Sequence, residues 1–225
     1  MSFTIQLFKC ILPSSSKALE DKVKSTSRNN LVIAVIIGAV LVIGMMIAGS
    51  YNSLVGSKEA VNGKINNLQS QYQRRADLVP QLVNTVKGSA NFEQETLDKV
   101  VNARAKATSI TIDPSKATPE QLQQYQNAQG ELSQALGRLL AVAENYPDLK
   151  TTKAFQDLQA QLEGTENRIQ VARQDYGSEV QQYNAKIKRF PTNVVAGMFN
   201  FDAFPYFKAD PGNEKAPEVN FDAQP

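Results

Sequence analysis

The longest uninterrupted apolar run in the chain lies near its start, at residues 31–49, which read LVIAVIIGAVLVIGMMIAG. These 19 positions contain no charged residue, no Asn or Gln and no Pro. A helix rises about 1.5 Å per residue, so this run spans roughly 28 Å, close to the ~30 Å hydrocarbon thickness of a bilayer. The rest of the chain is strongly polar. The pattern therefore predicts a single-pass transmembrane helix.

A cleaved signal peptide is the alternative interpretation, with Ala48-Gly49-Ser50 as a small-residue cleavage site. The run exceeds the usual apolar core of a signal peptide, about 7–15 residues, so we favour a retained span. Four Lys and Arg residues lie within residues 17–28 before the span, against two within residues 58–64 after it. The positive-inside rule then predicts a cytoplasmic N-terminus and a larger domain on the far side of the membrane.

From residue 51 onward, apolar positions recur in steps of three and four, which is typical of helices with one buried face. Four such runs extend over residues 54–86, 91–107, 122–146 and 155–187. No sustained period-two alternation supports strands. The sequence therefore predicts an all-α fold, an N-terminal transmembrane helix followed by an antiparallel bundle of about four long helices. An oligomeric coiled coil would give similar heptads, but the brief loops between the runs favour a bundle.

Local signals mark where these helices bend, stop and start. Pro80 lacks a backbone donor and should bend the first helix unless a local rearrangement absorbs it, and Gly88 is suited to end that helix. Thr118-Pro119-Glu120-Gln121 predicts the start of the third helix with a capping box. Asn91 and Gln94 have the same spacing at the start of the second. Because no proline separates the span from the first run, we expect one helix to contain both.

This organisation divides the chain into a basic leader at 1–30, the transmembrane helix at 31–49, a helical bundle domain at 50–189 and a C-terminal tail at 190–225. The tail holds six of the ten Phe residues, together with several prolines. Aromatic residues at this density either pack onto the bundle or bind a partner. We favour packing. The residues that would bind a partner are Phe199, Phe201, Phe204, Tyr206 and Phe207.

Composition removes several classes of function. Lys and Arg number 24 against 22 Asp and Glu, and the leader takes five of the basic residues, so the rest lacks the basic surplus of a nucleic-acid binder. No histidine is present, which excludes Ser-His-Asp and Cys-His catalysis and histidine zinc sites. Cys10 is the single cysteine and cannot form an internal disulfide. We predict no cofactor and no metal.

The best candidate for a site beyond apolar packing is a set of charged residues on the first and fourth predicted helices: Arg74, Arg75, Asp77, Glu163, Glu166, Arg168 and Arg173. We interpret this set as an interhelical ion-pair network. Glu163 and Glu166 share a helix face, and two carboxylates can do acid–base work or bind a divalent cation. The adjoining arginines and the lack of histidine rank that enzyme hypothesis below the structural one.

Several stretches resemble a known family: QRRADLVPQLVNTVKG at 73–88, ETLDKVVNARAKA at 95–107, ENYPDLK at 144–150, the segment from LQAQLEG to NVVAGMF at 158–199, and the terminal APEVNF. With Tyr51-Asn52 after the apolar helix, they are similar to the LemA family of bacterial membrane proteins. The resemblance implies a single-pass protein with a bundle of long antiparallel helices and no established catalytic activity. Some relatives are associated with membrane protease genes or with organelle-like membrane compartments. The thirty-residue leader departs from the family, whose members start a few residues before the span.

These observations give a leading hypothesis and two alternatives. The leading one is a non-enzymatic interaction or scaffold protein of the bacterial cell envelope, anchored in the inner membrane with its bundle outside the cytoplasm. Its expected partners are the lipid bilayer and unidentified envelope proteins, and not nucleic acid. The first alternative is a structural homo-oligomer of the membrane. The second, ranked below both, is an enzyme that uses Glu163 and Glu166.

Overall fold

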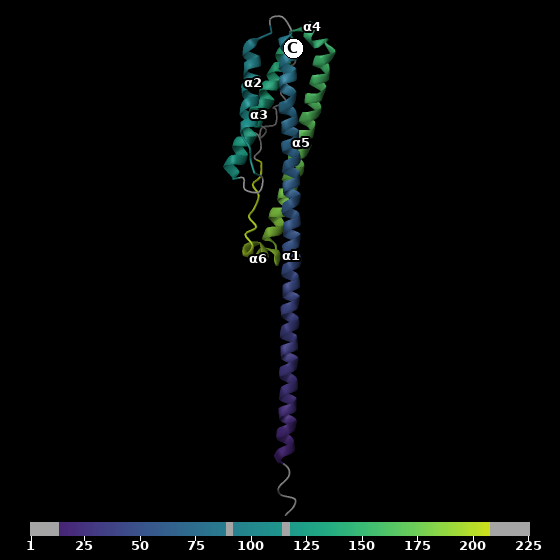
Figure 1. The fold of residues 1–225 in the computed structure, drawn as a ribbon, viewed down its shortest axis with the longest axis vertical. Helices are drawn as coiled ribbons and strands as arrows, with labels where there is room; N and C mark the ends of the chain where they lie inside the picture. Colours follow the sequence, from purple (N-terminus) through teal and green to yellow (C-terminus); the bar gives the residue numbers. More distant parts are fainter. Residues whose placement is uncertain (1–13, 89–91, 114–117, 208–225) are drawn as a thin grey trace, which may run out of the picture. The chain divides into compact units, whose positions relative to one another are not determined.

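The computed structural model describes residues 14–88, 92–113 and 118–207, and their side chains from Asn30 onward. Within these ranges every regular element is helical, as predicted. Figure 1 shows the six helices: α1 (Ser14–Lys87), α2 (Gln94–Ser109), α3 (Pro119–Ala143), α4 (Pro147–Lys150), α5 (Lys153–Lys188) and α6 (Thr192–Met198). The all-α prediction is thus confirmed. The helix α1 contains both the apolar span and the first amphipathic run, as expected, and it begins inside the predicted leader.

The chain separates into two compact units, with the boundary after Asn52. The described part of the first unit is the N-terminal portion of α1. Its large apolar side chains from Leu31 to Met46 are each more than half exposed. This helix is long and apolar enough to cross a membrane. A helix that is apolar on all sides and uncovered by protein is suited to a lipid environment.

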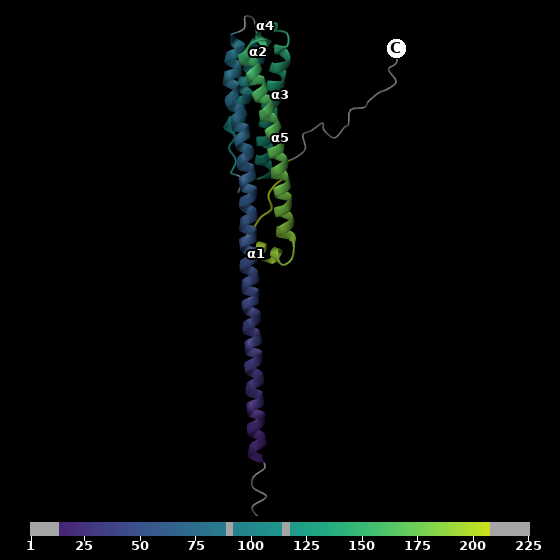
Figure 2. The ribbon, with the colours of Figure 1, turned by 90° about the vertical axis from the view of Figure 1, so that its right-hand side faces the viewer.

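The second unit is a bundle in which α2, α3 and α5 run alongside the C-terminal part of α1 (Figures 1 and 2). Two apolar clusters fill it, one towards α4 and one towards the C-terminal half of α5. The predicted core positions of the first run are all buried: Leu54, Val61, Ile65, Leu68, Tyr72, Ala76, Val79, Val83 and Val86. The step of three and four residues therefore identified the inward face of α1 correctly.

Pro80 does not end α1, which continues to Lys87. In a regular helix the amide of residue 80 would donate to the carbonyl of residue 76, but a proline has no N–H to give. Arg104 of α2 supplies the donor instead, with its Nε 2.8 Å from the carbonyl oxygen of Ala76. Ala76 is buried, so this replacement bond satisfies a carbonyl that water does not reach readily. Arg104, on the neighbouring helix α2, thus replaces the donor that Pro80 lacks.

The helix boundaries follow the predicted signals in part. The α3 capping box is confirmed: the Gln121 amide donates to the Thr118 hydroxyl at 3.2 Å, and the Thr118 amide donates to the Gln121 side chain at 3.0 Å. The α1 helix stops before Gly88, as predicted. The predicted start of α2 is wrong, because Glu93 holds its N-cap position. Asn91 lies outside the described residues.

The chain between α3 and α5 differs from the prediction. The α3 helix ends at Ala143, three residues before the end of the predicted run at residue 146, and Pro147 opens the short helix α4. Proline favours the first position of a helix, where its missing N–H would be unpaired in any case. The predicted tail also contains a helix that the pattern did not reveal, α6, between Pro191 and Phe199.

Candidate functional site

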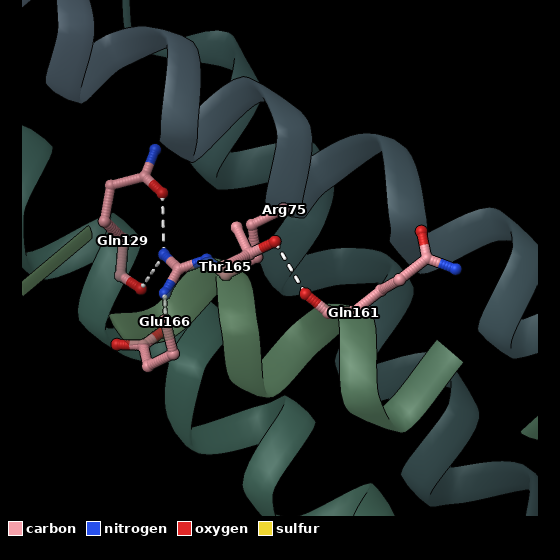
Figure 3. Close-up of polar contacts among 5 residues, drawn as sticks. All are labelled: Arg75, Gln129, Gln161, Thr165 and Glu166. Atoms are coloured by element: carbon pink, nitrogen blue, oxygen red, sulfur yellow. Dashed lines mark hydrogen bonds and ion pairs between the residues drawn. The ribbon is translucent and has the colours of Figure 1, made fainter. Parts of the chain in front are cut away.

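The guanidinium of Arg75 joins three helices at the middle of the bundle (Figure 3). Arg75 belongs to α1 and is 2% exposed. Its Nη1 donates to a carboxylate oxygen of Glu166 on α5 at 2.9 Å. Its Nη2 donates to both the backbone carbonyl and the side-chain oxygen of Gln129 on α3, each at 2.9 Å. Such charge-assisted bonds fix the helices' register as well as stabilising them.

The surroundings of Arg75 compensate its burial. The ring of Tyr72 lies 5.2 Å from the guanidinium carbon, within range of a cation–π contact. Gln129 continues the connection to α2, because its side-chain amide donates to the carbonyl of Ala107 at 3.2 Å. The Nε of Arg75 is buried without a hydrogen-bond partner among the described residues. We call Arg75, Gln129 and Glu166 the Arg75 seam.

The other predicted network residues lie on the bundle surface or bind elsewhere. Arg168 donates to Gln71 of α1 at 3.3 Å, which adds a second link between α5 and α1. Asp77 accepts from its own helix, from Gln73 at 2.7 Å. Arg74 is exposed. Arg75–Glu166 is thus an ion pair between two members of the predicted set, with Arg75 buried and the Glu166 side chain 39% exposed.

The two carboxylates proposed for acid–base chemistry have different environments. Glu163 is exposed and accepts from Gln159 on the same helix at 3.0 Å. Glu166 is committed to Arg75. Within the part of the chain that the structure describes, no group of three His, Cys, Asp or Glu side chains is placed to hold a metal ion. These environments favour a structural role for Glu166, as the ion-pair partner of Arg75, over a catalytic role.

A groove of about 720 Å³ lies over the Arg75 seam, between α3 and α5. Tyr72 and Arg75 of α1 contribute to its lining, and Asn127 and Gln134 on α3 are exposed along it. Arg173 of α5 also lines the groove. Side-chain amides both donate and accept hydrogen bonds, so this lining can contact a polar polypeptide surface without performing chemistry.

The predicted aromatic set divides into packed and exposed members. Phe204 is buried, and its ring lies 5.1 Å from that of Tyr183 in an edge-to-face contact. Phe207 makes a similar contact with Tyr176 at 5.1 Å. Phe201 is half-buried against the same apolar cluster. The packing interpretation describes these three residues, which hold the segment after α6 against α5 and α1.

Phe199 and Tyr206, in contrast, are about half exposed, at 48% and 52%. Phe199 precedes the packed residues in the sequence, and Tyr206 lies between Phe204 and Phe207. Residues 208–225 lie outside the described residues, and with them the terminal APEVNF and the last Phe of the tail.

Two tyrosines of α5 that pack against this segment, Tyr176 and Tyr183, have raised pKa values. Burial raises the pKa of Tyr176 to about 12, and burial together with the nearby charge of Asp202 raises that of Tyr183 to about 12. Burial also raises the pKa of Tyr125. All three phenols therefore stay protonated near neutral pH. The Tyr176 hydroxyl uses its proton to donate to the carbonyl of Pro205 at 3.0 Å.

Several residues that make contacts between elements were not among the predicted site residues. Asn184 binds the backbone of Phe204 twice, accepting from its amide at 3.0 Å and donating to its carbonyl at 2.9 Å. Lys64 and Asp175 pair across α1 and α5 at 2.8 Å. Gln129 did carry a signal, because it occupies a core position in the apolar run of α3. A polar residue at such a position needs a buried partner.

Comparison with known proteins agrees with the resemblance noted above. The sequence profile described as the LemA family matches residues 64–221. Protein LemA of Metamycoplasma hominis is 26% identical over 198 residues, which cover 84% of this chain and 87% of that protein. Magnetosome protein MamQ 2 of Paramagnetospirillum magneticum is 26% identical over 185 residues, and MamQ of Magnetospirillum gryphiswaldense is 24% identical over the same length. Each of these two alignments covers 73% of this chain and 66% of the MamQ protein.

Proposed function

Because the chain belongs to the LemA family, we propose that it is a non-enzymatic interaction protein that organises other proteins at a bacterial membrane. In this proposal the protein is a membrane-associated helical protein. The apolar part of α1 is its anchor, and the bundle binds other proteins. We place the anchor in the inner membrane, the N-terminus in the cytoplasm and the bundle outside it. A protease added to spheroplasts should then digest the bundle, and protection until lysis would refute this orientation.

The observation that carries the proposal is the bonding of Arg75, the one strongly buried charge among the residues that the structure describes. The guanidinium of Arg75 donates its hydrogen bonds to Glu166 and Gln129 of the bundle. A charge committed in this way holds the helices in register, and it is a poor general acid or nucleophile. The groove above it is lined partly by side-chain amide groups. A surface groove with adaptable polar groups is suited to recognising another protein.

Site-specific photo-crosslinking in native membranes tests the proposal. A photo-reactive amino acid would replace Asn127 at the groove, and a matched variant would carry it at Asn102, an exposed amide on α2 outside the groove lining. We expect cross-links to a different envelope protein from position 127 and few from position 102. Equal labelling at both positions, or none at either with the full chain in the membrane, would contradict the proposed use of the groove.

A structural homo-oligomer is the second candidate, and the apolar span supports it. Ala34 and Gly38, and again Gly44 and Ala48, are small residues four apart, a spacing that lets transmembrane helices approach closely. Cross-links from position 127 to a second copy of the same chain would favour this candidate over the first. A substitution Gly44→Leu should then lower the yield of the dimer in detergent cross-linking.

An enzyme that uses Glu163 and Glu166 remains a third candidate, below the other two. It predicts a bound divalent cation, because a pair of carboxylates can hold a metal ion that activates water. Elemental analysis of the purified full chain, compared between the native sequence and Glu163→Gln, tests this directly. A stoichiometric metal that is lost in the variant would favour the enzyme, and the absence of a bound metal from the native chain would count against it.

A further inference from the structure

The face of α6 that points away from the bundle is apolar. Phe190, Val194 and Met198 are 82%, 52% and 62% exposed. Val194 and Met198 lie four residues apart on α6 and share one face, and Phe190 lies in the turn before the helix, two residues ahead of Thr192. We call these three residues the α6 stripe. Val195 and Ala196, on the other side, are buried. The helix is therefore held by one face and presents Val194 and Met198 to its surroundings.

The charge around this stripe has one dominant sign. No charged residue occurs from Phe190 to Phe201, and the exposed Lys188 and Arg189 immediately precede the stripe. Asp202 is the single acidic residue between positions 180 and 207. Exposed apolar side chains beside basic residues are the features of a segment that lies in the interface of an anionic bilayer.

The position of the stripe in the chain makes a bilayer accessible to it. Lys186, near the end of α5, donates to the Ser53 carbonyl at 3.1 Å and to the Ser57 hydroxyl at 2.6 Å. Ser53 lies four positions after Gly49, where the apolar span ends, and a chain of four residues reaches at most about 14 Å. Phe190 lies four positions after Lys186. The connection from the span to the stripe therefore consists of two short stretches of chain and the contacts of Lys186 with Ser53 and Ser57.

We propose that the α6 stripe, Phe190, Val194 and Met198, docks into the interface of the membrane leaflet from which the span emerges. The apolar side chains enter the boundary between headgroups and acyl chains, and Lys188 and Arg189 bind the phosphates of anionic lipids. The bundle is then attached at two points, by the span and by the stripe. The proposal rests on the span being retained in the membrane, which also underlies the proposed function.

Tryptophan fluorescence tests the docking site by site, because the chain contains no Trp of its own. The test variant is Met198→Trp, and the matched control is Val171→Trp, an apolar residue of α5 that is 60% exposed and lies far along the bundle. Each full chain is reconstituted into vesicles of equimolar phosphatidylcholine and phosphatidylglycerol. Acyl-brominated lipids and aqueous acrylamide serve as quenchers, and circular dichroism checks that both variants fold.

We expect the Met198→Trp emission to shift to shorter wavelength, to be quenched strongly by brominated lipid and to be protected from acrylamide. The Val171→Trp emission should remain at the wavelength of water-exposed Trp and be quenched by acrylamide alone. Equal acrylamide quenching in both variants would overturn the proposal. A blue shift of Met198→Trp without quenching by brominated lipid would also overturn it, because a protein surface would then cover the stripe.

Vesicle flotation separates the two levels of failure. If the chain does not float with the vesicles, the span is not a membrane anchor, and both the proposed function and the docking of the stripe fail. If the chain floats and the tryptophan of the Met198→Trp variant stays exposed to acrylamide, only the docking fails. The membrane-anchored interaction protein would then stand without a second attachment point.

Discussion

Removing the side chain of Arg104 should destabilise the bundle only as long as Pro80 is present. The Arg104→Met substitution deletes the Nε that donates to the Ala76 carbonyl at 2.8 Å. Met keeps most of the apolar stem and has good helix propensity, so the guanidinium is the main loss. In the native background, Pro80 offers no amide to that carbonyl.

The cost follows from the burial of Ala76, which is 3% exposed. A buried carbonyl that loses a bond from a charged donor costs about 1–3 kcal/mol, and we expect about 2 kcal/mol for Arg104→Met. Pro80→Ala restores an N–H at the position where a regular helix would bond to Ala76. In that background, Arg104→Met should cost no more than about 0.5 kcal/mol. The coupling between the two positions is therefore expected to be about 1.5 kcal/mol.

The measurement is a double-mutant cycle on the full chain in detergent micelles. Unfolding of the native sequence, the two single variants and the double variant is followed by far-ultraviolet circular dichroism against guanidinium and temperature. For a domain of this size about 1 kcal/mol corresponds to 2–4 °C in the midpoint, so the effect is measurable. Arg74→Met is the control, because Arg74 is exposed on α1, the helix that contains Ala76 and Pro80.

If Arg104→Met costs the same in both backgrounds, the replacement-donor explanation is refuted. The arginine would then stabilise the bundle by packing or by its charge, and Pro80 would be tolerated for another reason. A large loss in the Arg74→Met control would also remove the distinction between a specific bond and a general loss of positive charge.

Other predictions concern the seam, the tyrosines and the α3 cap. Glu166→Ala should cost about 1–2 kcal/mol by removing the ion-pair partner of the buried Arg75, less than for a fully buried pair because the Glu166 side chain is 39% exposed, and adding Arg75→Met should recover part of it; further loss in the double variant would contradict this. Tyr176→Phe should cost about 1 kcal/mol, whereas Tyr183→Phe should be neutral or stabilising because its buried hydroxyl lacks a partner among the described residues. Because burial raises both tyrosine pKa values from 10.0 to about 12, their stabilisation is complete below pH 10 and should be lost as pH rises to 12, less steeply in Tyr176→Phe. Thr118→Ala should cost about 1 kcal/mol in the same unfolding assay, and a midpoint equal to that of the native sequence would show that the capping box is dispensable.

The features that sequence revealed are those that repeat or that are local. The core face of α1 from Leu54 to Val86 follows from a helical period, since each core residue predicts the next. The α3 cap follows from four adjacent residues, Thr118 to Gln121. The same helical phase could have separated Arg75 from Arg74, which we predicted to belong to one network: Arg75 lies three residues after Tyr72 and faces the core, and Arg74 faces solvent.

The features that sequence did not reveal depend on contacts between distant parts of the chain. Nothing in the residues around Pro80 indicates that Arg104, on another helix, will satisfy the Ala76 carbonyl. The partner of Arg75 was equally open, because Glu163 and Glu166 are both acidic and only the rotation of α5 selects Glu166. A period identifies which face of a helix is buried, but it does not determine how two helices are rotated against each other.

The contact between Asn184 and Phe204 has a consequence for how the family can vary. Asn184 binds the amide and the carbonyl of residue 204, and neither group depends on which side chain that residue carries. The requirement for a particular amino acid thus falls on position 184, where a side-chain amide must both donate and accept. Position 204 needs only an apolar side chain that fits against Tyr183. Among relatives, we expect Asn to persist at the first position while the second exchanges freely among large apolar residues.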